Sequence, residues 1–188
     1  VIVGFLKGLT ENHIILTLAE GVVRMSIFLI YLALVARMED IKRVFMYHGA
    51  EHKTIFCYEK GLALTVENVR EQSRFHPRCG TSFMILMLIV SILLSYLLTL
   101  IPAVSWLAQN YSIVWVIIKL LLLPLTCGIG YELIRISGRY DNIVTRIISA
   151  PGVWLQHVST KEPDDSMIEI AIEALKAVIP ENSEDDNW

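Results

Sequence analysis

A pair of histidines with a glutamate between them is the first place where this sequence could carry chemistry. The chain reads His48-Gly49-Ala50-Glu51-His52, so the histidines lie four residues apart and the glutamate directly precedes the second. On an α-helix, residues four apart share a face, and two imidazoles placed in this way can bind one divalent metal ion. In zinc peptidases with this order of residues, the glutamate acts on a water molecule bound to the metal. The spacing therefore favours a metal site with His48 and His52 as ligands and Glu51 as the catalytic base.

Further donors could complete such a metal site. The stretch 74–80, RFHPRCG, supplies an imidazole from His76 and a thiol from Cys79, and a thiolate is a ligand that zinc favours. A carboxylate from Glu132, or from Glu59, is the alternative ligand. With nitrogen and sulfur donors, we expect zinc rather than magnesium or calcium. Paired histidines on a half-apolar helix also occur as hydrogen-bonded packing residues, so a metal-free role stays open.

The segments around these motifs are too apolar for a soluble domain. The chain has 188 residues, of which 54% are hydrophobic, and its mean hydropathy is +0.54. Residues 81–101 carry no charge, and a helix needs about 20 such residues to cross a bilayer. Residues 112–131 are nearly as apolar, and residues 14–36 carry only Glu20 and Arg24. The sequence thus predicts an all-α integral membrane protein with about three transmembrane helices.

Three charged residues lie inside these predicted spans. Glu20 and Arg24 are four residues apart, so they are expected to pair along one helix face and to neutralise each other. Lys119 lies in the last span and is expected to extend its amine toward the headgroups. We therefore interpret all three as structural.

We expect the chain to be organised in six segments. They are a remnant of a longer chain at 1–12, a first transmembrane helix at 13–36, a cytoplasmic helical loop with both motifs at 37–80, a transmembrane hairpin at 81–133, an interfacial segment at 134–160, and a C-terminal cytoplasmic amphipathic helix with an acidic tail at 161–188. Pro102 and the polar residues 109–111 predict a short turn inside the hairpin. Ile168, Ile172 and Leu175 form an apolar stripe, which predicts that the last helix packs against the loop or a partner.

Basic residues predict the orientation of the helices. Eight lysines and arginines fall within residues 37–79, whereas residues 102–111 contain none. Because cytoplasmic loops near membrane spans are enriched in basic residues, we expect the large loop and the C-terminus on the cytoplasmic side. The net charge is −3 and no basic stripe with interleaved aromatic residues occurs, so the lipid bilayer, and not a nucleic acid, is the expected partner.

Four stretches of this sequence carry a resemblance to a known family. They are YHGAEHKTIFCYE at 47–59, RFHPRCGTSF at 74–83, GIGYE at 128–132 and TKEPDDSMIEIAIEAL at 160–175. With them the chain resembles the DUF1385 family of bacterial polytopic membrane proteins, whose members are described as metal-dependent enzymes. The resemblance implies a multi-pass protein of the bacterial inner membrane. Family members also carry a glycine-rich segment of the kind GGQAVxEGVMMR before the first span, and the chain departs from this pattern at its start.

Two functions are compatible with these observations. The first is a metal-dependent hydrolase of unknown substrate, with His48 and His52 as ligands, Cys79, His76 or Glu132 completing the shell, and Glu51 as the general base. The second is a non-catalytic membrane scaffold, or an assembly or translocation partner, whose C-terminal helix binds a membrane protein or a second copy of the chain. A hydrolase requires an open coordination position, whereas a structural site is closed by four protein ligands.

Overall fold

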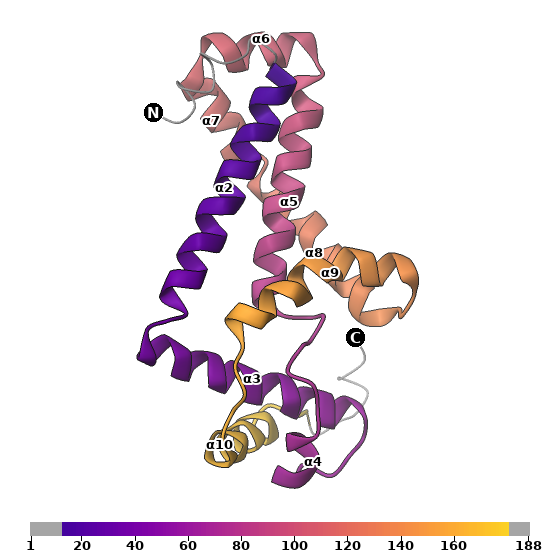
Figure 1. Ribbon diagram of the computed structural model, residues 1–188. Helices are drawn as coiled ribbons and strands as arrows, with labels where there is room; N and C mark the ends of the chain where they lie inside the picture. Colours follow the sequence, from indigo (N-terminus) through magenta and orange to yellow (C-terminus); the bar gives the residue numbers. More distant parts are fainter. Residues whose placement is uncertain (1–12, 181–188) are drawn as a thin grey trace.

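The computed structural model describes residues 13–180, and every regular element in this range is a helix (Figure 1). The N-terminal remnant predicted at 1–12 and the acidic tail at 181–188 lie outside the described residues. The elements are α2 (His13–Val35), α3 (Glu39–Glu59), α4 (Val66–Arg70), α5 (Gly80–Thr99), α6 (Pro102–Asn110), α7 (Ser112–Leu121), α8 (Leu123–Arg139), α9 (Ile143–Ser159) and α10 (Asp165–Lys176). The all-α prediction is confirmed.

Two of these helices are long and apolar enough to cross a membrane. They cover Ile15–Val35 in α2 and Gly80–Thr99 in α5, and the two helices pack against each other (Figure 1). Both carry large apolar side chains that the protein leaves exposed, such as Val22 at 65% and Leu97 at 54%. Such surfaces match the hydrocarbon of a bilayer. The two helices therefore confirm a membrane protein of helical type.

The third candidate span is broken. α7 and α8 together have the length and composition of a span, but the two helices are bent by 42° at Leu122. Pro124 lies in the first turn of α8, where its missing N–H and fixed φ favour the start of a helix over the continuation of one. The span predicted at 112–131 is thus a bent pair that runs on to Arg139.

The connection inside the hairpin differs from the predicted short turn. Residues Pro102–Asn110 form α6, with Pro102 in its first turn. A proline at this position loses no hydrogen bond, because the first N–H groups of a helix have no partner within it. In Figure 1, α6 lies at the end of the α2 and α5 pair that is opposite to α3.

At the other end of the spans, α3, α4 and α10 form a small packed unit. Its core consists of side chains that are at most 5% exposed, namely Ala50, Cys57, Val69, Met167, Ile168 and Ile172. The side chain of Asp164 caps α10 by accepting a hydrogen bond from the N–H of Met167. Two residues of the predicted C-terminal stripe, Ile168 and Ile172, are therefore buried against the α3 loop region.

Helix α9 connects the spans with this unit. It packs against α5 and α8, and it ends at Ser159 next to the start of α5 (Figure 1). Gly152 permits the close crossing, because a Cβ there would overlap the backbone and side chain of Ser82. The chain then continues in extended form through Thr160 toward α10. This path brings the residues around Ser159 to the face of α3 that carries the histidines.

Candidate metal centre

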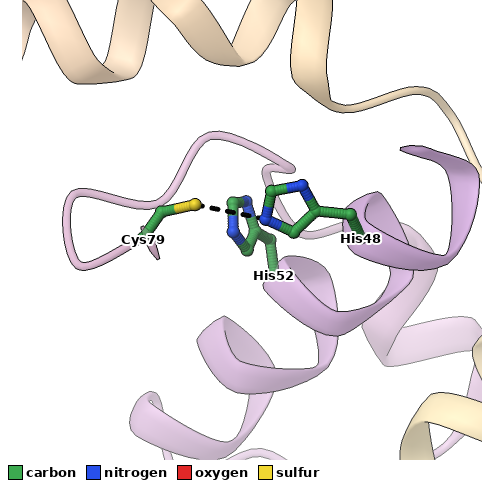
Figure 2. A group of neighbouring side chains, drawn as sticks. All are labelled: His48, His52 and Cys79. Carbon is green, nitrogen blue, oxygen red and sulfur yellow. Dashed lines mark hydrogen bonds between the residues drawn. The ribbon is translucent and has the colours of Figure 1, made fainter. Parts of the chain in front are cut away.

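Three potential metal ligands converge where α3 meets the start of α5. His48 and His52 project from one face of α3 toward Cys79, the residue that directly precedes α5 (Figure 2). One ligand atom from each of the three residues lies within 4.8 Å of the others. The ring centroids of the two histidines are 4.3 Å apart, and Nε2 of His48 lies 3.1 Å from Sγ of Cys79. The structure thus brings together the two motifs that the sequence singled out.

Backbone carbonyl groups fix the orientation of both imidazoles. Nδ1 of His48 lies 2.8 Å from the carbonyl oxygen of Ser159, and Nδ1 of His52 lies 2.6 Å from that of Arg74. Because a carbonyl oxygen only accepts, each Nδ1 donates, which leaves the Nε2 lone pair of a neutral ring free for another partner. Metal-binding histidines in proteins commonly donate the N–H of the ring nitrogen that does not bind the metal. Both rings are therefore set to offer Nε2 as a ligand.

The site is buried, and hydrogen bonds within it shift the pKa values of Cys79 and His48. Cys79 is 5% exposed and His52 is 3% exposed. Burial alone would raise the pKa of the Cys79 thiol, but hydrogen bonds from His48, His52 and Thr81 outweigh it and lower the pKa to about 5. Burial alone would lower the pKa of His48, but its hydrogen bonds to Cys79 and Ser159 outweigh burial and raise the pKa. The thiolate, which is the form that binds metal and attacks electrophiles, is thus favoured at neutral pH.

The glycine of the HGAEH segment allows the chain after α9 to approach α3. The N–H of Lys161 donates to the carbonyl oxygen of Phe45 at 2.8 Å. A Cβ on Gly49 would lie well inside van der Waals contact with the carbonyl oxygen of Lys161. Since Ser159 is only two residues earlier, this close approach helps to place its carbonyl oxygen against His48. Gly49 is therefore part of the geometry of the site.

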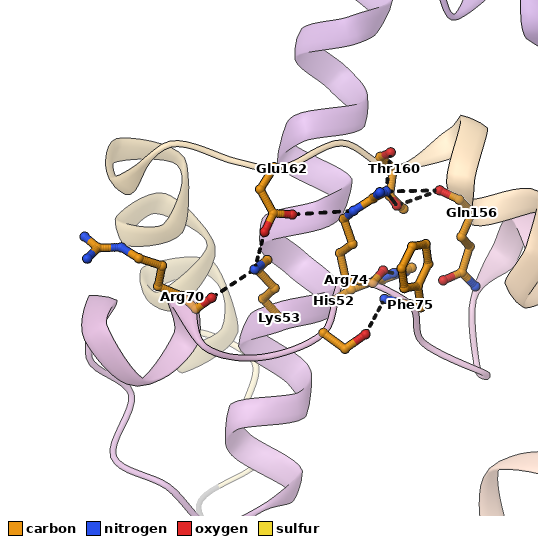
Figure 3. Close-up of polar contacts among 9 residues, drawn as sticks. His52, Lys53, Arg70, Arg74, Phe75, Gln156, Thr160 and Glu162 are labelled. Carbon is orange, nitrogen blue, oxygen red and sulfur yellow. Dashed lines mark hydrogen bonds and ion pairs between the residues drawn. The ribbon is translucent and has the colours of Figure 1, made fainter.

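A polar network holds in place the carbonyl group of Arg74, which contacts His52 (Figure 3). The guanidinium of Arg74 donates to both the carbonyl and the hydroxyl oxygen of Thr160 at 2.8 Å, and it lies 3.4 Å from the carboxylate of Glu162. The same carboxylate accepts from Nζ of Lys53 at 2.6 Å, and this amine also donates to the carbonyl oxygen of Arg70. The Lys53 side chain is only 5% exposed. The network fixes the backbone at Arg74, whose carbonyl oxygen orients His52.

His76 lies close to this group but has other partners. Its Nε2 lies 3.2 Å from the carboxylate of Glu59, and its Nδ1 accepts from the N–H of Arg78 at 3.2 Å. Arg78 also pairs with Glu59. Burial raises the pKa of the Glu59 carboxyl, but the contacts with His76 and Arg78 outweigh it and lower the pKa. The structure thus places His76 in an ion-pair cluster beside the three potential ligands rather than among them.

The other two acidic candidates, Glu132 and Glu51, also lie outside the three-residue group. Glu132 is on α8 and pairs with Arg135 at 3.3 Å. Glu51 projects from α3 toward a pocket of about 360 Å³ between α3 and α10, which Tyr47 and Leu175 also line. The negative charge of Glu51 is the smallest of the named contributions that raise the pKa of His48. Within residues 13–180, the group that could hold a metal ion therefore consists of His48, His52 and Cys79.

One functionally placed residue was not singled out from the sequence. Gln156 of α9 is fully buried, and its amide accepts from the N–H of His76 at 2.7 Å and donates to the carbonyl oxygen of His76 and the hydroxyl of Ser82. It anchors the loop that ends in Cys79 to α9. A single glutamine in an apolar helix was the only available hint.

The fold and the site define a helical membrane protein with a His/His/Cys cluster at one end of its spans. The chain belongs to the DUF1385 family, because the model of this family, described as "Protein of unknown function (DUF1385)", matches residues 1–181. The chain is also similar to "Uncharacterized protein YqhQ" from Bacillus subtilis (strain 168), with 38% identity over 161 residues. The match covers 85% of this chain and 48% of that relative, so the chain spans about half its length. No solved structure matches the chain.

Proposed function

We propose that this protein binds one zinc ion through His48, His52 and Cys79, and that it is a metal-dependent hydrolase in the bacterial cell membrane. The observation that carries the proposal is the orientation of the two imidazoles. Each donates Nδ1–H to a backbone carbonyl oxygen, and the Nε2 atom of His48 lies 3.1 Å from Sγ of Cys79. A thiolate nucleophile would need one such histidine, whereas two histidines that converge on one sulfur fit a shared cation.

The donor set supports zinc among the divalent metals. Zinc favours four-coordinate sites built from imidazole nitrogen and thiolate sulfur, whereas magnesium and calcium favour oxygen ligands. The pKa of about 5 favours the Cys79 thiolate at neutral pH, and the Nε2 proton that an imidazole shares with this sulfur would be released when zinc binds. The residues present therefore fit zinc.

The number of ligands supports a catalytic site. Three potential protein ligands converge within residues 13–180, and catalytic zinc sites keep the fourth position for water or substrate. When bound, zinc would lower the pKa of a coordinated water molecule to about 7 and so supply a nucleophile. Glu51 is the proposed general base because of the order of residues in the HGAEH segment, and to act on that water its carboxylate would have to turn from the pocket between α3 and α10 toward the cluster. Its carboxylate would accept a proton from that water.

A role as a scaffold or assembly partner is the second candidate function. It is favoured by the outer surface of α10 and of the turn after it, where Ile170 is 53% exposed and Val178 is 73% exposed, and both residues line the same pocket as Glu51. These residues could contact a membrane-protein partner or a second copy of the chain. In this case the metal would fasten α3 to the start of α5, and a fourth protein ligand would close the site.

Metal analysis of the purified chain tests the proposal. We expect about one zinc per chain in protein prepared in detergent without chelator. His48→Ala, His52→Ala and Cys79→Ser should each remove most of it, because the remaining donors no longer offset the dehydration of the ion. His157→Ala and Cys127→Ser are matched controls of the same chemistry away from the cluster, and both should retain the metal. Protein that is folded but contains no stoichiometric transition metal would contradict the proposal.

The Glu51→Gln variant separates the two candidate functions. The hydrolase predicts full zinc content together with loss of the cellular function that the wild type supports. A structural site predicts full zinc content with that function intact. Loss of zinc in Glu51→Gln would show that Glu51 is a ligand, which would contradict its assignment as a base.

A further inference from the structure

A second polar site lies inside the spans, at the end opposite to the His/His/Cys cluster. It is a pocket of about 370 Å³ between α2, α5, α6 and α7. Glu20, Arg24 and Lys119 line it together with several hydroxyl groups, from Thr17, Ser91, Thr99, Ser105 and Ser112. In Figure 1 these helices meet below α6, far from α3. The pocket is therefore separate from the candidate metal centre.

The charges in this pocket do not balance. Arg24 lies 3.2 Å from the carboxylate of Glu20, and Nζ of Lys119, from a different helix, lies 3.9 Å from the same carboxylate. Among the pocket-lining residues in the described part of the chain, Glu20 is the only acidic one, so two cations face one anion. Charges inside a bilayer are costly unless they are paired. An anionic group would complete the pairing.

The depth and the walls of the pocket indicate which kind of anion fits. Arg24 is nine residues from the start of the α2 span, or about 13 Å along a helix, and the pocket extends from there to Ser105 and Gln109 of α6 at the end of the span. Part of the wall is apolar and is formed by the side chains of Leu16, Val116, Leu120 and Leu123. The Lys119 amine lies over the ring of Trp115, 4.8 Å from the ring centroid. A small soluble anion would leave these walls uncovered. An amphiphile with an anionic headgroup and acyl chains would contact both kinds of surface.

We propose that this pocket binds the phosphate group of an anionic membrane lipid, with Arg24 and Lys119 as the cationic contacts. Charge-assisted hydrogen bonds to a phosphate are among the strong polar contacts in proteins, and hydroxyl groups such as those of Ser91 and Ser112 add neutral donors. The lipid enters from the leaflet at the α6 end. Its phosphate supplies the negative charge that the Glu20, Arg24 and Lys119 cluster lacks.

The test uses the full chain in neutral detergent micelles doped with phosphatidylglycerol, and lipid retained on the protein is quantified by native mass spectrometry. Lys119→Gln should weaken phosphatidylglycerol binding about tenfold, the equivalent of one charge-assisted hydrogen bond. Glu20→Gln should strengthen it, since the variant adds one net positive charge to the pocket. Arg135→Gln, which removes an exposed cation on α8, is the control and should leave binding unchanged. Lys119→Arg keeps the charge and should restore binding.

Two further arms identify the source of the anion. Phosphatidylcholine in the same micelles should bind no better to the wild type than to Lys119→Gln, because it lacks net charge. Inorganic phosphate should not compete with phosphatidylglycerol at equal concentration, because it cannot cover the apolar wall. Equal binding of the two lipids, parallel losses in Glu20→Gln and Lys119→Gln, or displacement by inorganic phosphate would each overturn the proposal.

Discussion

The Nδ1 atom of His48 donates a hydrogen bond of 2.8 Å to the carbonyl oxygen of Ser159, a residue 111 positions later in the chain. Through this bond α3 contacts the end of α9, while His48 contacts Cys79 at the start of α5. The cluster is therefore assembled from three separate parts of the chain. Its geometry depends on how closely these parts approach one another, and this dependence can be tested away from the ligands.

Gly49→Ala should disturb the site without altering any ligand. The new Cβ would overlap the carbonyl oxygen of Lys161, which is backbone and cannot rotate away. We expect a loss of unfolding free energy of about 1–3 kcal/mol and a lower zinc content. Gly128→Ala is the matched control, since a Cβ there meets nothing within 4 Å, and it should be neutral or slightly stabilising. Thermal unfolding measures the stability of both variants, and an equal stability of the two variants would disprove the close approach.

Glu162→Gln should weaken the network that orients His52. The substitution removes the carboxylate that pairs with Lys53 and Arg74. The amine of Lys53 is nearly buried, and its charge then keeps the hydrogen bond to the carbonyl oxygen of Arg70 but has no anionic partner among the described residues. Because Glu162 itself is 66% exposed, we expect a cost of about 1–2 kcal/mol rather than that of a fully buried pair. Glu173→Gln, which removes an exposed pair with Lys176, should cost less than half of this in the same denaturation assay.

Acid should destabilise the protein in part through Glu59. Its folded-state pKa lies below the ordinary value because of His76 and Arg78, so its stabilisation is fully present above the unfolded pKa, about 4.3. The stabilisation is lost as the pH falls below that value and through the lower folded pKa. Wild-type protein should therefore lose stability more steeply than Glu59→Gln below about pH 4.3. Parallel curves in chemical denaturation at a series of pH values would show that the pairing contributes nothing.

The orientation of the spans is testable with single cysteines. We predict that the α4 side of the protein is cytoplasmic and the α6 side external, because basic residues crowd 37–79 and do not occur in 102–111. An impermeant thiol reagent added to intact cells should label a cysteine at Gln109→Cys on α6 and leave one at Glu67→Cys on α4 unlabelled. Both positions are exposed in the folded protein. Labelling of the α4 cysteine alone would reverse the topology.

The sequence predicted the helices well because apolar runs and helical periodicity are local signals. The uncharged run at 81–101 became α5, and the spacing of His48 and His52 led to one face of α3. The bend at Leu122 was missed, because Pro124 in an apolar run can either kink a helix or start a new one.

The surroundings of the site could not be predicted in the same way. The groups that orient the imidazoles are backbone carbonyl oxygens of Ser159 and Arg74, and every residue type carries such a group. Likewise, the sequence offered His76 and Glu132 as ligands on residue type alone. Only the folded chain shows that His76 faces Glu59 and that Glu132 faces Arg135.

Cobalt substitution is the most direct test of the central claim that two imidazoles and the Cys79 thiolate bind one metal ion. Cobalt(II) occupies zinc sites, and coordination by a thiolate adds a sulfur-to-cobalt charge-transfer band in the near ultraviolet. We predict that the metal-free full chain shows this band on titration with one equivalent of cobalt, that Cys127→Ser keeps it, and that zinc abolishes it by displacement. Cys79→Ser should lose the band, and His48→Ala should bind cobalt weakly. A charge-transfer band that survives in Cys79→Ser, or none in the wild type, would contradict the assignment.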